Sequence, residues 1–364
     1  MRSFITSIVC LLIATASVAQ TGYYTISGVV LNAETKVPLQ GASVYAENTT
    51  LGAATDQDGK FYLSLPDGGY NLVVSYTGFN TQDIKVSASN ASSPLSFQLT
   101  VKEKVMQEVA IVSTNEVKNG WEKYGKFFLD EFIGQSPNGA ATSIKNPEVL
   151  KFYYSKRKNR LKVLAGEPLI IENNALGYTI KYELDSLVHE YNSTMTVYTG
   201  YPLFEEMKSA DSVQQHSWQE ARRKAYYGSV LHFMRSLYNH QIVNAGYEIQ
   251  FIIKVNGEDS ALKLKDFYKA LNYEKSDSLS LVSIKPNQLV LGVLYKKEKP
   301  AAAYLKDNPD SPTEFQFSTI TFKPEEKLTI EKNGFYFDQN DIVIAEYWEW
   351  SKMADMLPFD FWPE

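Results

Sequence analysis

Five side chains between residues 222 and 240 combine groups that bind anions or move protons. Arg222 carries a planar guanidinium that can donate two hydrogen bonds to one carboxylate or phosphate. His232 and His240 change charge near neutral pH, and the hydroxyl groups of Tyr226 and Ser236 both donate and accept hydrogen bonds. If one helix presents all five side chains together, they predict a binding site for an anionic ligand.

The sequence around these residues predicts one long helix. Ser217 followed by Glu220 is a capping-box pattern, and helical sequence continues to about Asn244. At 100° per residue, the apolar residues of this segment share the face that would pack on the core. Near a second line on the helix surface lie Arg222, Ser236 and His240, with Tyr226 beside that line and His232 farther round.

A structural role for the same residues is the alternative. Arg222 begins a run of three basic residues, which is typical of a solvated helix face, and histidines often bond to backbone or carboxylate groups. Gly228 within a helix is unfavourable by about 1 kcal/mol relative to alanine. Such a glycine favours a packing contact at this point, for example the close approach of a strand. The structural interpretation is favoured, and the five residues remain candidate ligand-binding residues.

Several enzyme classes lack their motifs in this sequence. The four histidines form neither HExxH nor HxxE, and there is no GxSxG elbow, phosphate-binding loop or paired-cysteine motif. We therefore predict no metal, no cofactor and no catalytic residue. A pair of catalytic carboxylates stays open, because 42 acidic residues allow many spatial pairings.

The first 19 residues predict a signal peptide. Arg2 precedes an apolar run from Phe4 to Ala16, and Ser17 and Ala19 are small residues suited to cleavage before Gln20. The run is shorter than the roughly 20 apolar residues that span a membrane, and no later segment approaches that length. We expect an extracytoplasmic protein with no transmembrane segment in the mature chain. Its formal net charge of −6 argues against a nucleic-acid partner.

The region from 20 to 100 has the pattern of a small β-sandwich. Alternation of apolar and polar residues runs through 42–46, 61–65, 72–76 and 95–99. Asp58-Gly59 predicts a tight hairpin, and residues 66–69 predict another turn. Short strands at this spacing predict an all-β immunoglobulin-like sandwich.

The order of motifs in this region resembles a known family. ISGVV at 26–30 is followed by PLQGASVY at 38–45, TDQDGKFYLSLP at 55–66 and YNLVVSYTGF at 70–79. This order resembles the carboxypeptidase regulatory-like domain, which has a transthyretin-like fold. The resemblance implies a non-catalytic module found at the N-termini of many Bacteroidetes envelope proteins.

Beyond a linker at 101–115, residues 116–364 predict an α+β domain with an antiparallel sheet and one long helix. Trp121, Tyr124, Phe128 and Phe132 lie on one face of a predicted helix over 119–132. Strands are predicted at 150–154, 169–172, 177–187, 194–203, 247–255, 289–295, 314–322 and 342–347. A short helix is expected at 262–271, a surface loop at 301–312, and an aromatic tail that packs on the core.

This second region resembles uncharacterised Bacteroidetes proteins that carry the same N-terminal sandwich. The resemblance rests on FIGQSPNGAATSIKNPEVLKFYY at 132–154, TGYPLFEEM at 199–207 and MADMLPFDFWP at 353–363. Those proteins often have a cysteine where this chain has Thr142 and Ser143. A thiol role at that position is therefore not expected here.

Three functions fit this organisation. The first is a non-catalytic binding or accessory protein of the cell envelope, whose partner is a protein or glycan. An extracytoplasmic hydrolase that uses carboxylates of the C-terminal domain is the second. The third is an accessory subunit of a TonB-dependent outer-membrane transporter.

Overall fold

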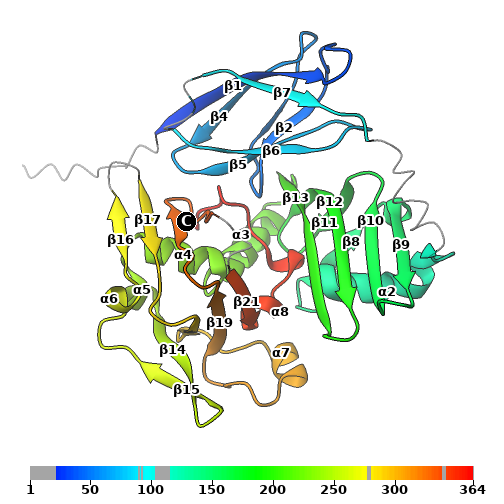
Figure 1. Ribbon diagram of the computed structural model, residues 1–364. Helices are drawn as coiled ribbons and strands as arrows, with labels where there is room; N and C mark the ends of the chain where they lie inside the picture. Colours follow the sequence, from blue (N-terminus) through cyan, green and yellow to red (C-terminus); the bar gives the residue numbers. More distant parts are fainter. Residues whose placement is uncertain are drawn as a thin grey trace, which may run out of the picture.

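The computed structural model describes residues 22–88, 91, 93–102, 115–276, 280–337 and 342–363. The predicted signal peptide and residues 103–114 of the predicted linker lie outside the described residues. Three β-rich parts surround the C-terminal segment, which is drawn in red at the centre of Figure 1. Within the described residues, no helix has the length and apolar character needed to cross a membrane.

The first part is the predicted sandwich, which the structure confirms. One sheet has the order β4-β1-β7 and the other β3-β2-β5-β6. Val30, Phe61, Leu72 and Val74 pack between the sheets with almost no exposure. The strands are β1 (Tyr23–Asn32), β2 (Ser43–Ala46), β3 (Gly52–Ala54), β4 (Lys60–Pro66), β5 (Tyr70–Ser75), β6 (Gln82–Val86) and β7 (Leu95–Leu99).

The turn at Asp58-Gly59 is not the predicted hairpin. It joins β3 to β4, which belong to different sheets, so the chain crosses the sandwich here. The Asp56 carboxylate accepts hydrogen bonds from the amides of Asp58 and Lys60 at 2.9 and 2.8 Å. Gly59 has φ +71°, and a Cβ there would lie 2.6 Å from the Val30 carbonyl oxygen. The alternation of residues predicts strands but not the sheet to which each strand belongs.

The second part is an antiparallel sheet of order β8-β11-β12-β10-β9, with β13 pairing β12 at the free edge. The predicted helix is present as α2 (Gly120–Phe132). Its Phe128 and Phe132 rings contact Phe152 and Tyr182 of the sheet. The strands are β8 (Thr142–Ile144), β9 (Leu150–Ser155), β10 (Arg160–Ala165), β11 (Leu169–Asn173), β12 (Tyr178–Glu190) and β13 (Met195–Glu206), and the 3-10 turns are η2 (Gly139–Ala141) and η3 (Pro147–Val149).

The third part contains a sheet of order β15-β14-β18-β19-β21 and a smaller one of order β16-β17-β20. Phe233, Met234 and Leu237 form a core with both sheets. Its strands are β14 (Tyr247–Val255), β15 (Glu258–Lys263), β16 (Glu274–Ser276), β17 (Leu281–Ile284), β18 (Val290–Tyr295), β19 (Gln316–Phe322), β20 (Leu328–Glu331) and β21 (Ile342–Glu346). The short helices are α6 (Phe267–Ala270), α7 (Ala302–Asp307), α8 (Tyr347–Trp350) and the 3-10 turn η5 (Met353–Asp355).

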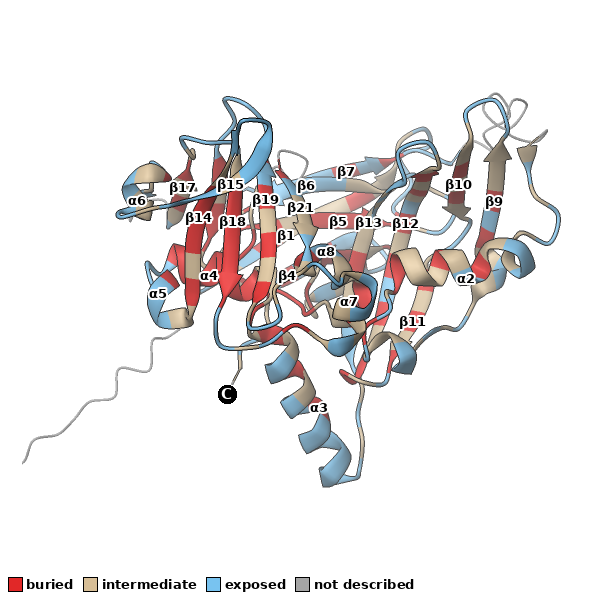
Figure 2. Cartoon of the chain, turned by 90° about the horizontal axis from the view of Figure 1, so that it is seen from below, coloured by how far each residue is buried: buried red, intermediate tan, exposed pale blue. Residues whose placement is uncertain are grey.

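The single long helix predicted in the middle of the chain is wrong. The segment forms α3 (Ser212–Tyr226), α4 (Val230–Tyr238) and α5 (Ile242–Ala245), and Asp211 caps α3 instead of Ser217. Gly228 breaks the helix with φ +81°, and Ser229 caps α4 by accepting a hydrogen bond from the His232 amide. In Figure 2, α3 projects from the body with a mostly exposed surface, whereas α4 is buried.

The expected packing contact at Gly228 is present. A Cβ at this position would lie 2.6 Å from Oε1 of Gln316 and 2.8 Å from the Tyr295 ring, so strands β18 and β19 approach closely. The indole nitrogen of Trp348 donates to the Gly228 carbonyl oxygen at 2.6 Å. Tertiary contacts therefore favour the break over a continuous helix.

Two other local predictions differ from the structure. Most of the predicted helix at 262–271 is the end of β15 and a loop, and only Phe267–Ala270 is helical. The predicted loop at 301–312 includes α7. The tail prediction is confirmed, since Leu357 and Phe359 are buried against the core.

Candidate functional site

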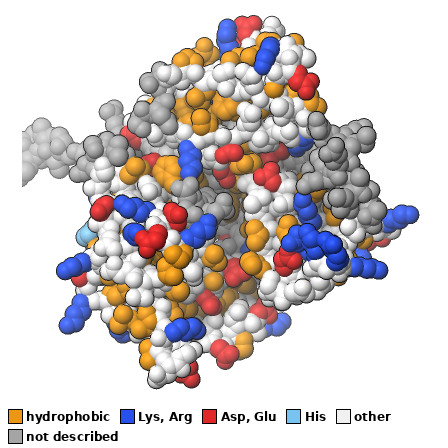
Figure 3. Space-filling model, in the orientation of Figure 1, with side chains coloured by type: hydrophobic (Ala, Val, Ile, Leu, Met, Phe, Trp, Pro, Cys, Tyr) orange, Lys and Arg blue, Asp and Glu red, His pale blue; other side chains and the backbone are white. Residues whose placement is uncertain are grey.

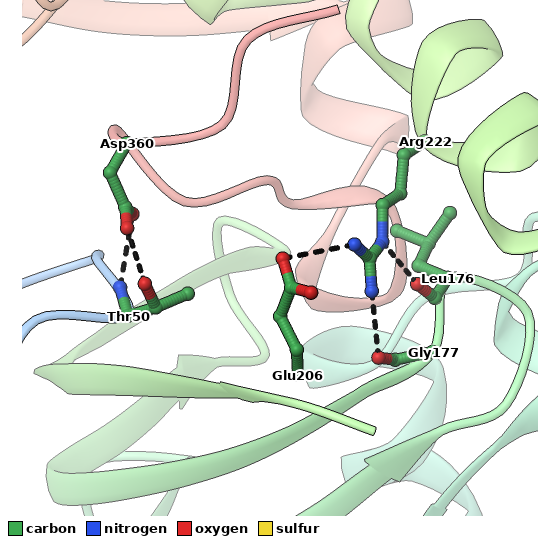
Figure 4. Close-up of polar contacts among 6 residues, drawn as sticks. All are labelled: Thr50, Leu176, Gly177, Glu206, Arg222 and Asp360. Atoms are coloured by element: carbon green, nitrogen blue, oxygen red, sulfur yellow. Dashed lines mark hydrogen bonds and ion pairs between the residues drawn. The ribbon is translucent and has the colours of Figure 1, made fainter. Parts of the chain in front are cut away.

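Arg222 is 7% exposed and lies among acceptors supplied by the protein. Its Nε donates to the Leu176 carbonyl at 2.7 Å, and another guanidinium nitrogen donates to the Gly177 carbonyl at 3.0 Å. A third donates to the Glu206 carboxylate at 3.1 Å, as Figure 4 shows. The Tyr178 ring lies 3.9 Å from the guanidinium carbon. The guanidinium that would hold an anionic ligand thus joins α3 to the turn before β12 and to β13.

Tyr226, His232 and Ser236 are buried near the break between α3 and α4. The Nδ1 atom of His232 accepts from the Gly228 amide at 3.2 Å and lies 3.0 Å from the Tyr247 hydroxyl. Burial, with a smaller contribution from Lys297 and Arg235, lowers the pKa of His232 to about 4. Ser236 donates to the His232 carbonyl at 2.7 Å. A histidine that is neutral at pH 7 and hydrogen-bonded in this way stabilises the helix break.

His240 lies apart from the other four predicted residues. It is exposed, has φ +57°, and stacks on Tyr268 with 3.6 Å between ring centroids. None of the five predicted residues lines the three cavities described below. Their assignment as ligand-binding residues stays a prediction, and their contacts are those of structural residues.

Arg235 is buried more deeply than any of the five predicted residues. Only 2% of it is exposed, and it donates to the carbonyls of Asn333, Phe359 and Phe361 at 2.9, 2.9 and 2.8 Å. The Trp362 ring lies 3.7 Å from its guanidinium carbon. The sequence contained a signal for this role, since Arg235 lies within the apolar run VLHFMRSLY and buried arginines are rare unless paired.

The tail that Arg235 holds also binds the sandwich. Asp360 accepts hydrogen bonds from both the amide, at 3.0 Å, and the hydroxyl of Thr50 (Figure 4). The Phe359 amide donates to the Asn48 carbonyl at 2.7 Å. The three parts of the chain are therefore joined through one segment.

A cavity of about 780 Å³ lies where the three parts and the tail meet, and we call it the junction cavity. The sandwich contributes Glu47, Asp83 and Lys85 to its lining, and the second part contributes Tyr182, Asp185 and residues 196–202 except Val197. The third part and the tail add Leu231, Phe335, Tyr336, Ile344, Trp348, Glu349, Lys352, Asp355 and Phe359, among others. Figure 3 shows acidic side chains along the boundary below the sandwich.

Glu47 and Asp185 of the junction cavity have raised pKa values. The pKa of Glu47 is raised to about 7, chiefly by burial, while a hydrogen bond from Asn71 opposes the rise and the negative charges of Asp83 and Asp185 add to it. That bond, from Nδ2 of Asn71 to Glu47, is 2.8 Å long. Burial also raises the pKa of Asp185, although Lys102 opposes the shift. Glu47 therefore exchanges its proton near neutral pH.

The junction cavity also has hydrogen-bond acceptors without a partner. Oδ1 of Asn48, Oδ1 of Asn71 and Oδ2 of Asp355 are buried and have no hydrogen-bond partner among the described residues, and all three side chains line the cavity. An unsatisfied buried polar atom costs about 1–3 kcal/mol. Hydrogen-bond donors that enter the cavity would reduce this cost.

Two other cavities are lined by fewer of the three parts. One of about 740 Å³ includes Glu205, Glu206 and Trp218 in its lining. The indole nitrogen of Trp218 already donates to the Asn174 carbonyl. The other, of about 260 Å³, includes Tyr45, Glu183 and Lys102. Within the part of the chain that the structure describes, no three His, Cys, Asp or Glu side chains are grouped closely enough to hold a metal ion.

Sequence reasoning missed the junction cavity for a physical reason. Glu47, Asp83 and Asp185 come from three segments that have no common motif. The first two belong to the sandwich, and only its packing on β12 and β13 brings Asp185 to the same cavity. The sequence indicated only that many pairs of carboxylates were possible, without identifying these three residues.

Comparison with known proteins places the first part of the chain. Residues 26–111 match the model of the CarboxypepD_reg-like domain. The N-terminal sandwich is a CarboxypepD_reg-like domain. This match agrees with the resemblance noted in the sequence, and it leaves most of the chain outside the matched residues.

Similar curated proteins are TonB-dependent receptors. TonB-dependent receptor P3 of Formosa agariphila is 23% identical over 208 residues, which are 56% of this chain and 19% of that protein. TonB-dependent receptor SusC of Bacteroides thetaiotaomicron is 33% identical over 94 residues, which are 26% of this chain and 9% of that protein. The chain thus matches less than a fifth of the length of either receptor.

Similar solved structures superpose only loosely on this chain. A cohesin–X-dockerin complex from Acetivibrio cellulolyticus gives a TM-score of 0.19 at 26% identity, over 21% of this chain and 57% of that one. A DUF3823 family protein from Bacteroides ovatus gives a TM-score of 0.18 at 10% identity, over 52% and 83% of the two chains.

Proposed function

We propose that this chain is a non-catalytic accessory protein of the cell envelope that binds a partner or ligand in the junction cavity. The sandwich at 20–100 and the region 116–364 form the cavity together. In this proposal the first 19 residues direct the protein out of the cytoplasm. The similarity to parts of TonB-dependent receptors supports a place at the outer membrane.

The junction cavity carries the proposal. Ligand sites often form between packed parts of a protein, and a volume of about 780 Å³ is within the usual range for them. The unpartnered oxygens of Asn48, Asn71 and Asp355 leave acceptors for donors of a bound group. The aromatic side chains of Tyr182, Tyr336 and others supply apolar contact.

Site-specific photocrosslinking tests the proposal. Thr199 is exposed and lines the junction cavity, whereas Val255 is exposed on the β14–β15 hairpin away from it. Thr199→Cys and Val255→Cys, each combined with Cys10→Ser, would carry a thiol-linked benzophenone. In envelope extract from cells that make the protein, we expect a specific adduct only at position 199. Equal adducts at both positions, or none at position 199, would contradict binding in the cavity.

A hydrolase is the second candidate, and the raised pKa of Glu47 beside Asp83 and Asp185 favours it. A carboxylic acid that titrates near pH 7 is suited to general acid catalysis. Purified protein would be tested on peptide and glycan libraries, with Glu47→Gln as the matched variant. Turnover that Glu47→Gln abolishes would replace the accessory function with an enzymatic one.

Association with a TonB-dependent receptor is the third candidate, on the similarity to parts of two such receptors. Affinity purification from detergent-extracted membranes would recover one receptor in a defined ratio. If a receptor is recovered equally well by a variant whose cavity is filled, such as Leu231→Trp, it binds elsewhere on the protein.

A further inference from the structure

Strand β13 lies beside the junction cavity with an open edge. Within the described residues β13 pairs with β12 on one side. A cavity on one face of a sheet is lined by alternate residues of a strand. Residues 198–202 line the junction cavity consecutively, so the cavity lies along the edge of β13.

One end of this edge already pairs with a turn of the sandwich. The Asn48 amide donates to the Pro202 carbonyl at 2.8 Å, and the Phe204 amide donates to the Thr49 carbonyl at 2.9 Å. Thr49 and Leu203 form a parallel bridge. Residues 48 and 49 of the sandwich, a turn residue and a single β-bridge, thus occupy this end of the β13 edge.

The same edge is open farther along β13. Backbone groups of successive strand residues point alternately to the two sides, so those of Thr196, Tyr198 and Gly200 point the same way as those of Pro202 and Phe204. Among the described residues, no backbone hydrogen bond from another segment reaches these three. With respect to the described part of the chain, the edge from Thr196 to Gly200 thus has free backbone donors and acceptors next to the cavity.

Sequence features that protect sheet edges are missing from this stretch. Proteins commonly block such edges with charged residues, proline or a covering segment. MTVYTGY at 195–201 has no charged residue and no proline, and its Val, Thr and Tyr residues favour strands. Met195 and Val197 are 57% and 53% exposed. An open edge of this composition is suited to strand addition by another chain.

The charge beside the edge defines the chemistry of that chain. Glu47, Asp83, Asp185, Glu349 and Asp355 line the junction cavity, against Lys85 and Lys352. Lys352 also pairs with Glu131 at 3.4 Å, which reduces its effect in the cavity. The lining therefore attracts a cation more than an anion.

We propose that the edge of β13 from Thr196 to Gly200 pairs with an extended segment of a partner protein, and that a basic side chain of this segment enters the junction cavity. The inference rests on the proposed function and names the partner chemistry for the same cavity. Main-chain hydrogen bonds to β13 supply affinity, and the carboxylates select lysine or arginine.

A displayed library of random heptapeptides, panned against the full chain, is the probe. We expect enriched peptides to contain Lys or Arg and to have β-branched residues at alternate positions. The strongest peptide would then be N-methylated on its odd or on its even residues. Since strand pairing uses the amides of alternate residues, only one of the two versions should lose at least about tenfold in affinity. No enrichment, or equal binding of both versions, would overturn the strand pairing.

Charge variants test the second half of the proposal. Asp83→Asn with Asp185→Asn should weaken the enriched peptide at least about tenfold. Asp259→Asn is the control, because Asp259 is exposed on the β14–β15 hairpin and pairs with Lys254. Urea unfolding verifies that both proteins are folded. Acidic enriched peptides, or unchanged binding to the double variant, would overturn the basic partner.

The two proposals fail in different ways. An adduct at position 199 without any enriched peptide leaves binding in the cavity intact and contradicts strand pairing. Absence of both the adduct and enriched peptides contradicts the proposed function as well.

Discussion

Replacing Arg235 with methionine should strongly destabilise the protein. The guanidinium donates to three carbonyls, those of Asn333, Phe359 and Phe361, and its carbon lies 3.7 Å from the Trp362 ring. Methionine keeps much of the apolar volume and removes every donor. Each buried carbonyl left without a donor costs about 1–3 kcal/mol. Because the buried charge itself carried a desolvation cost, we expect a net loss of about 3–5 kcal/mol.

Urea unfolding and amide hydrogen exchange measure the two parts of this prediction. The free energy of unfolding should fall by the stated amount, and the Phe359 amide, which donates to the Asn48 carbonyl, should exchange faster. Arg223→Met is the matched control, because Arg223 is half-exposed and pairs with Glu220, so a change within about 0.5 kcal/mol is expected. A loss below about 1 kcal/mol for Arg235→Met, with unchanged exchange at Phe359, would refute the role of Arg235 in holding the tail.

Three further predictions follow from other contacts. Gly228→Ala should lower the free energy of urea unfolding by about 1–3 kcal/mol, because φ is +81° and the new Cβ would meet Gln316. Gly257→Ala is the control and should cost less, because Gly257 has a similar φ of +89° but open space around its Cβ position. Because the pKa of Glu47 is raised, this residue stabilises the fold at pH values below its ordinary pKa of 4.5, and the stabilisation is lost as the pH rises to about 7. In Glu47→Gln, the free energy of unfolding should decline less over this pH range. An unchanged decline would contradict the shift. Asp360→Ala removes the acceptor for Thr50 and should cost about 1–2 kcal/mol, with faster proteolysis of the tail as the check.

Strands were the most predictable feature of this chain. In β4 the burial alternates along KFYLSLP, as the period of two requires, and the sequence showed this directly. The pairing of strands was harder to predict from the sequence, because Asp58-Gly59 is compatible both with a hairpin and with a crossing between sheets. Local residue types define a turn, and the partner of each strand depends on residues far away in the chain.

The break at Gly228 illustrates the same limit for helices. Residues 212–244 have helical propensity on both sides of the glycine, and Gly228-Ser229 indicated a packing reason without indicating a break. The deciding contact is the hydrogen bond from Trp348, 120 residues farther along the chain. A contact at that separation has no signature in the local sequence. The predicted polar stripe failed to form for this reason, since it required one continuous helix.

The tail links the stability of the protein to its proposed binding site. Met356, Leu357 and Phe359 line the junction cavity, and the carbonyl of Phe359 accepts from Arg235. The Phe359 amide in turn bonds to Asn48, whose own amide pairs with β13 at Pro202. Movement of the tail would therefore change both the wall of the cavity and the segment that covers one end of the β13 edge. A buried arginine without a carboxylate partner among its hydrogen bonds is costly to retain for stability alone. Its position is explained if the shape of the cavity must be kept while three separately packed parts meet around it.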